Sequence, residues 1–71
     1  MKTETVGNNL RMHRQLTGLT QEDIAMRIGV TRQTIIAIEK GNYVPSVLLA
    51  LKIAREFSKP VEEIFYVDES R

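Results

Sequence analysis

The chain has 71 residues, no cysteine, one histidine and a formal net charge of +1. This length predicts one small domain, residues 1–71, without disulfides and with too few nitrogen and sulfur ligands for a structural zinc site. No apolar run approaches the roughly 20 residues of a membrane span, and the polar start MKTETVGNN has no signal-peptide core, so we expect a cytoplasmic protein. The sequence shows no catalytic constellation and no glycine-rich phosphate loop, so we expect no enzyme and no cofactor, metal or small-molecule site.

The first predicted helix begins at Asn8 or Asn9 and continues to about residue 17. An asparagine can cap its start, and Gly18 ends it. Leu10 and His13 share its inner face, so we expect His13 to pack at the edge of the core. The alternative is a pH sensor, because histidine titrates near neutral pH.

Residues 20–41, TQEDIAMRIGVTRQTIIAIEKG, predict two short amphipathic helices joined by a tight turn at Gly29. Thr20 can cap the first helix, with Asp23 at the carboxylate position of a capping box, and Thr31 can cap the second. The apolar residues that recur at helical spacing are Ile24, Ala25, Ile28, Ile35 and Ile38. Two capped helices around a glycine turn form a helix-turn-helix, which implies a DNA partner.

Two further helices are predicted after this pair. Ser46 can cap a fourth helix, and Pro60 precedes a short fifth helix over residues 61–65. The broad apolar face of the fourth helix is expected to be the main core element, through Val47, Leu48, Leu51, Ile53, Ala54 and Phe57. The predicted fold is therefore an all-α bundle of five helices, followed by an acidic tail, residues 66–71.

The chain resembles the helix-turn-helix domains of the phage Cro and repressor (Cro/C1) type, also called the Xre family, over about residues 8–65. The resemblance lies in Gly18-Leu19-Thr20-Gln21, Ala25, Ile28-Gly29-Val30, Arg32-Gln33-Thr34-Ile35, Ile38-Glu39, Gly41, Pro45-Ser46 and Glu63-Ile64-Phe65. It implies a lambda-repressor-like fold and a short, single-domain transcriptional regulator, most simply a repressor.

The helix 32–40 is the expected DNA-reading element, because the second helix of such a pair enters the major groove with its N-terminal residues at the base edges. Arg32 and Gln33 are the expected base readers, since Arg can pair bidentately with guanine and Gln with adenine. The resemblance indicates the same two residues. Ile36 and Ala37 can offer only apolar contact, so we expect one of them to pack on a thymine methyl group.

Phosphate contacts are expected around the recognition helix. Gln21, at the start of the preceding helix, can reach a phosphate oxygen, and the resemblance gives it the same role. The other candidates are Thr31, Thr34, Lys40, Asn42 and Ser46. The alternative for Lys40 and Asn42 is simple solvation of the C-terminal end of the helix.

Arg14 and Glu39 match a charged pair that, in Cro- and repressor-like domains, joins the first helix to the recognition helix from within. The resemblance therefore implies an internal ion pair here. Its expected role is to orient the two helices rather than to add stability, because desolvation of a buried pair can cost as much as the attraction returns.

The last predicted helix ends in four apolar or aromatic residues, Ile64, Phe65, Tyr66 and Val67, which a small core can hardly bury together. We expect them to form the interface of a homodimer that binds a palindromic operator, since two-fold protein symmetry matches a two-fold site. The alternative is that Ile64 and Phe65 close the monomer core while Tyr66 and Val67 fray.

The charges are unevenly spread along the chain. Residues 1–42 hold six Lys or Arg against four acids, a net charge of +2, whereas residues 62–71 hold one Arg against four acids, a net charge of −3. We expect the acidic end to point away from phosphate. The alternative function is an antitoxin-like or protein-interaction module of the same fold, which the low net charge favours and the presence of Arg32, Gln33 and Gln21 disfavours.

Overall fold

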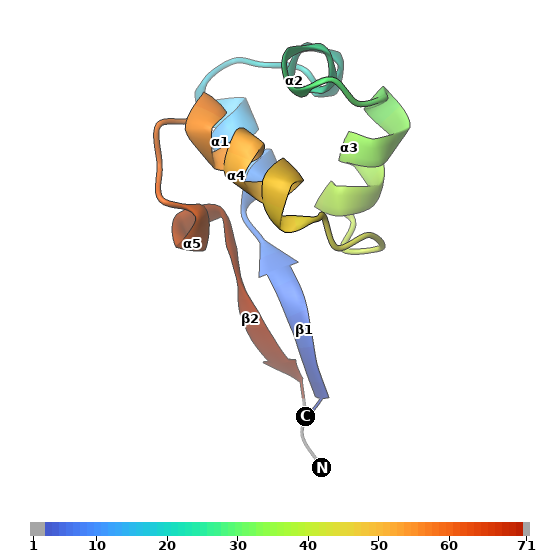
Figure 1. The fold of residues 1–71 in the computed structure, drawn as a ribbon, viewed down its shortest axis with the longest axis vertical. Helices are drawn as coiled ribbons and strands as arrows, with labels where there is room; N and C mark the ends of the chain where they lie inside the picture. The colour runs from blue at the N-terminus through green and yellow to red at the C-terminus, as the bar shows by residue number, and fades with distance from the viewer. Residues whose placement is uncertain (1–2, 71) are drawn as a thin grey trace.

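The computed structural model describes residues 3–70, with side chains described through residue 69. In this range the elements follow in the order β1 (Thr3–Asn8), α1 (Leu10–Leu16), α2 (Gln21–Ile28), α3 (Arg32–Glu39), α4 (Val47–Glu56), α5 (Val61–Ile64) and β2 (Phe65–Ser70). Figure 1 shows the helices gathered at one end and the two strands extending from them as a ribbon. The five predicted helices are confirmed, and the mostly helical fold agrees with the predicted class.

The core lies between the helices, and every helix contributes to it. Its buried residues are Leu10, Ile24, Ala25, Ile28, Ile35, Ile38, Ile53, Ala54, Phe57 and Ile64. The inner faces predicted for the first three helices are therefore confirmed. His13 is half-buried with its ring centroid 5.8 Å from that of Phe57, which confirms packing at the edge of the core.

The caps predicted for α2 and α3 are present. The Thr20 hydroxyl accepts a hydrogen bond from the Asp23 backbone N–H at 3.0 Å, and the Asp23 carboxylate accepts one from the Thr20 backbone N–H at 2.8 Å. Hydrogen bonding of the Asp23 carboxyl to Thr20, first to its backbone N–H and then to its side chain, holds the pKa of that carboxyl below its usual 3.8. Gly29 ends α2 at φ +79°, and Thr31 caps α3 by accepting from the Thr34 backbone N–H at 3.3 Å.

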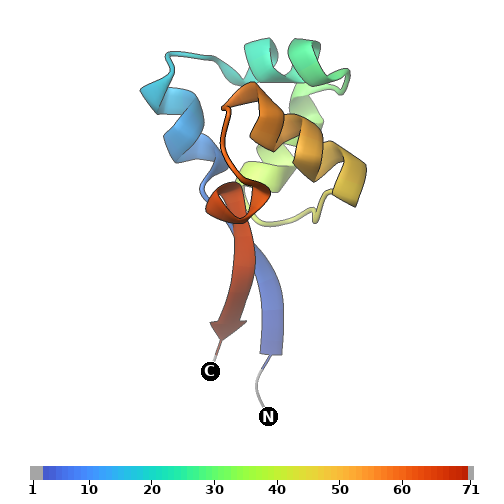
Figure 2. The ribbon, with the colours of Figure 1, turned by 60° about the vertical axis from the view of Figure 1, so that its left-hand side comes forward.

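The two strands were not predicted, and they correct the picture of an acidic tail. β1 and β2 pair antiparallel from Thr3↔Ser70 to Asn8↔Phe65, so residues 66–70 belong to a ribbon, while Arg71 lies outside the described residues. Figures 1 and 2 show this ribbon projecting away from the helices. Inside it, the Tyr66 ring covers Gly7 so closely that a Cβ there would lie 2.5 Å from Tyr66 Cε2. Local sequence patterns cannot reveal a strand whose partner lies at the other end of the chain.

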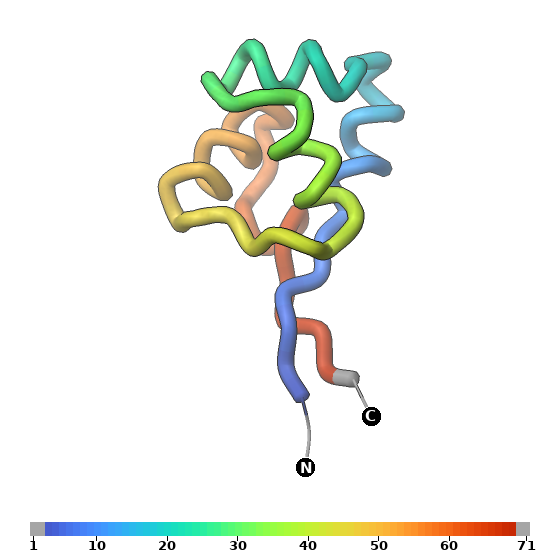
Figure 3. The backbone as a smooth tube through the Cα atoms, turned by 90° about the vertical axis from the view of Figure 1, so that its right-hand side faces the viewer, coloured from blue at the N-terminus to red at the C-terminus, as the bar shows by residue number. Residues whose placement is uncertain are grey.

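The prediction for α4 was half wrong. Its C-terminal half packs as expected, with Ile53 and Ala54 buried, but Val47, Leu48 and Leu51 are 76%, 66% and 51% exposed. Figure 3 shows the reason, because the N-terminal half of α4 extends past α3 to the margin of the domain. A helix can carry an apolar face that is longer than the surface covering it, and this one leaves an apolar patch open. Within residues 3–70, no helix is long and apolar enough to cross a membrane.

Candidate nucleic-acid interface

The rotation of α3 about its own axis is set by two buried residues. Ile35 and Ile38 are completely buried in the core, so the opposite side of α3 faces outward. Arg32 and Gln33 are exposed at the N-terminal end of that side, as a major-groove reader requires. The remaining outward positions of the helix, Thr34, Ile36 and Ala37, are half-buried. In Figure 3, α3 lies on the face toward the viewer with α2 above it.

Behind this surface, the ion pair between α1 and α3 is present. Arg14 Nε donates to Glu39 Oε2 at 2.7 Å and a terminal guanidinium nitrogen donates to Oε1 at 3.3 Å. The other terminal nitrogen of Arg14 donates to the Leu19 carbonyl at 3.0 Å. Only 12% of the Arg14 side chain and 6% of the Glu39 side chain are exposed, so the pair is nearly enclosed. Arg14 thus ties α3 to the end of α1 and to the segment that leads into α2.

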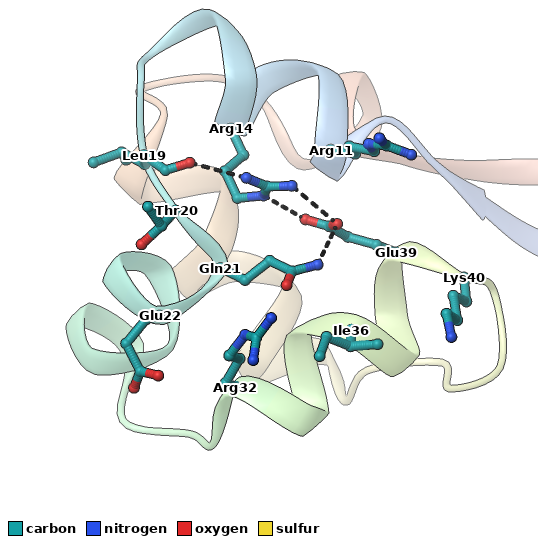
Figure 4. Close-up of a pocket in the computed structure, with 10 residues that line it drawn as sticks. All are labelled: Arg11, Arg14, Leu19, Thr20, Gln21, Glu22, Arg32, Ile36, Glu39 and Lys40. Atoms are coloured by element: carbon teal, nitrogen blue, oxygen red, sulfur yellow. Dashed lines mark hydrogen bonds and ion pairs between the residues drawn. The ribbon is translucent and has the colours of Figure 1, made fainter.

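Gln21 joins the same network instead of standing free. Its Nε2 donates to Glu39 Oε1 at 3.1 Å, which holds the amide over the ion pair, as Figure 4 shows. One of its two amide hydrogens is thereby used. The second hydrogen remains for a ligand, so the network fixes the Gln21 amide without exhausting it.

The other phosphate candidates fall into two groups. Some hydroxyls are already engaged: Thr31 and Thr34 share a hydrogen bond at 3.1 Å, and Ser46 accepts from the Leu49 backbone N–H at 3.1 Å as the cap of α4. A capping hydroxyl can still donate its own hydrogen outward. Lys40 and Asn42 are exposed beyond the C-terminal end of α3.

Comparison with known proteins agrees with this geometry. The sequence profile of the helix-turn-helix family matches residues 10–64, which is most of the chain. The chain belongs to the helix-turn-helix family. The family predicted from the sequence is thereby confirmed.

Relatives of this helix-turn-helix protein occur in archaea and bacteria. An uncharacterised HTH-type transcriptional regulator of Methanothermobacter thermautotrophicus is 57% identical over 61 residues, covering 84% of this chain and 88% of the relative. The uncharacterised HTH-type transcriptional regulator YgzD of Bacillus subtilis is 50% identical over 62 residues, covering 87% of this chain and 94% of the relative. Among solved structures, the restriction-modification controller protein C.AhdI from Aeromonas hydrophila has a TM-score of 0.71 and 31% identity over 76% of this chain and 78% of that one.

The structure of this helix-turn-helix protein gathers only part of the predicted site into one place. An open cleft between α1, the start of α2 and α3 contains six of the predicted site residues: Arg14, Gln21, Arg32, Ile36, Glu39 and Lys40. The other candidates, Gln33, Ala37, Thr31, Thr34, Asn42 and Ser46, do not line this cleft.

Sequence reasoning missed Arg11, which lines the same cleft from α1. Its position three residues before Arg14 places both on neighbouring parts of one helix surface, and this spacing was the available signal. Asn8 was also missed as a structural link. Its side-chain N–H donates to the Ile38 carbonyl at 2.8 Å, which connects the ribbon to the end of α3.

The predicted dimer residues require a correction. Ile64 is completely buried in the monomer core, so its side chain cannot contact a partner, and Phe65 packs against that core. Tyr66 and Val67 are 43% and 67% exposed, but they do not fray, because β2 pairs them with Gly7 and Val6. Ile64, the last residue of the short α5, is buried in the core, and Tyr66 and Val67 belong to the paired chain ends, so the four apolar residues are not surplus.

Proposed function

We propose that this protein is a cytoplasmic, non-enzymatic, single-domain regulator that binds double-stranded DNA sequence-specifically and represses transcription by occupying an operator. The observation that supports it best is the outward face of α3. Arg32 and Gln33 are exposed at the end of a helix whose rotation is locked by Ile35 and Ile38. Side chains that project from a rigid helix can hold the bidentate hydrogen-bond geometry by which Arg and Gln distinguish one base from another.

In this proposal Arg32 reads a guanine and Gln33 an adenine, each discriminating by about 1–3 kcal/mol. Ile36 and Ala37 stand further along α3 and contribute apolar contact with a thymine methyl group. The phosphate contacts come from Gln21, Thr31, Thr34, Lys40, Asn42 and Ser46. Such contacts position the protein on the duplex without reading sequence.

The protein acts as a homodimer on a palindromic site in this proposal. The apolar surface available for it consists of Val47, Leu48 and Leu51 on α4 together with Val67 on β2, all of them exposed, whereas Tyr66 is the neighbour of Val67 in the strand and points to the other face of the ribbon. Val44 connects the two parts, since it precedes α4 and lines a groove with Val67. An apolar surface of this kind, beside the DNA-reading helix, is suited to a second copy that presents its own α3 to the next half-site.

The experiment is an in vitro selection of random duplex DNA by the wild type, by Gln33→Ala and by a matched control, Gln15→Ala. Gln15 is exposed on α1 and makes no side-chain hydrogen bond within residues 3–70. We expect the wild type and Gln15→Ala to select one palindromic motif. Gln33→Ala should lose selection at one base pair of each half-site, because the amide that reads it is gone.

Two results would contradict the proposal in different ways. An unchanged motif with Gln33→Ala would remove Gln33 from base reading. Recovery of no motif by the wild type, with only weak salt-sensitive binding, would reject sequence-specific regulation and favour the antitoxin-like or protein-interaction module. The exposed apolar surface on α4 would then be the place to look for a protein partner.

A further inference from the structure

The cleft between α1, α2 and α3 concentrates positive charge. Its lining includes four cations, Arg11, Arg14, Arg32 and Lys40, and two carboxylates, Glu22 and Glu39, so it carries a net charge of +2. The whole chain carries only +1. This nearly neutral protein therefore has a local excess of positive charge beside the recognition helix α3, in the cleft between α3 and α1.

Two of these six charges, those of Arg14 and Glu39, neutralise each other; the other four are the exposed carboxylate of Glu22 and three cations. Arg14 and Glu39 satisfy each other within the network that also holds Gln21. Arg11, Arg32 and Lys40 are exposed and have no ion-pair partner in the part of the chain that the structure describes. Figure 4 shows Arg11 and Arg32 on opposite sides of the Gln21 and Glu39 side chains. The available cations thus surround the cleft from α1 and from both ends of α3.

Arg11 is poorly explained by the stability of the fold. It lies in the first turn of α1, which contains no acidic residue, and a cation there opposes the positive end of the helix dipole. It is exposed and therefore covers little of the core. A residue that breaks a local rule without a compensating contact in the fold is a candidate for a functional role.

We propose that this cleft binds one phosphodiester group of the DNA backbone, and that Arg11 is the α1 residue that contacts it. The guanidinium fits two phosphate oxygens at once, and the second amide hydrogen of Gln21 supplies a further donor from the cleft floor. Because Arg32 and Ile36 belong both to the cleft and to the recognition helix, the strand that borders the groove read by α3 passes the cleft. This inference rests on the proposed function and adds α1 to the DNA-binding surface.

The test compares Arg11→Gln with a matched control, Arg55→Gln. Arg55 is exposed in the last turn of α4 and does not line the cleft, so both variants lose one positive charge but only one changes the proposed site. The probes are the duplex selected by the wild type and an unrelated duplex of equal length. Affinities are measured between about 50 and about 200 mM salt, because the slope of log K against log salt is negative and each lost phosphate contact reduces its magnitude by about 0.9.

Over this fourfold range, the affinity advantage of the wild type over Arg11→Gln should shrink by about 3.5-fold for each half-site bound. The loss should be similar on both duplexes, since a phosphate contact carries no sequence information. Arg55→Gln should match the wild type in slope. A thermal melt of each variant without DNA should show a cooperative transition well above the temperature of the binding assay, which separates binding from folding.

Single methylphosphonate substitutions locate the contact. One position per half-site should weaken the wild type but leave Arg11→Gln unaffected. Equal salt slopes for the wild type and Arg11→Gln, or an altered base preference in Arg11→Gln, would overturn the assignment. Competition by inorganic phosphate at constant ionic strength, without any methylphosphonate effect, would show a free-anion site instead. Failure of the wild type to select any duplex would reject the proposed function itself, and this inference with it.

Discussion

Replacing Glu39 by alanine should destabilise the protein strongly, because Arg14 would keep its charge and lose its counter-charge. Arg14 donates two hydrogen bonds to the Glu39 carboxylate, at 2.7 and 3.3 Å, and retains only the bond to the Leu19 carbonyl. Breaking a buried pair by removing one partner costs about 3–5 kcal/mol. Since 12% of the Arg14 side chain is exposed and one hydrogen bond survives, we expect the lower end, about 3 kcal/mol.

The assay is urea unfolding followed by far-ultraviolet circular dichroism, at one fixed protein concentration because self-association would contribute to stability. A loss of about 3 kcal/mol corresponds to a melting temperature lower by about 12–24 °C in a domain of this size. The double variant Arg14→Met/Glu39→Leu should recover most of the loss, since no buried charge is left alone. A single variant Glu39→Ala within about 0.5 kcal/mol of the wild type would refute the reasoning, because that is the range of ordinary surface substitutions.

Two further predictions concern the capping box and the apolar surface. The pKa of the Asp23 carboxyl is 3.8 in the unfolded chain and lower in the folded protein. Its carboxylate therefore stabilises the fold fully above pH 3.8, and this stabilisation is lost as the pH falls through the pKa of the folded state. The destabilisation by Asp23→Asn should therefore shrink in melts taken from neutral pH to below 3.8, and a pH-independent difference would contradict the cap. If the proposed homodimer forms through α4, Leu51→Lys should shift it toward monomer in sedimentation experiments, whereas Leu16→Lys, which alters a residue 77% exposed on α1, should not. Identical association of the two variants would move the interface away from α4.

The helix-turn-helix was predictable because the interactions that define it are local. Each cap joins residues three positions apart, and Gly29 ends α2 through its own backbone conformation. The buried stripes of α2 and α3 follow the helical repeat, so Ile35 and Ile38 also determine which residues of α3 face outward. The ion pair of Arg14 with Glu39 was predictable only through the family resemblance, because its partners are 25 positions apart in the chain.

The sequence by itself therefore determined the helices, their caps, the inner faces of α1 to α3 and the outward position of Arg32 and Gln33. The tertiary structure decided the pairing of β1 with β2, the exposure of the first half of α4, the burial of Ile64 and the attachment of Gln21 to Glu39. The physical reason is the range of the interactions. A periodic pattern shows which side of an element is apolar, but what covers that side depends on segments far away in the chain.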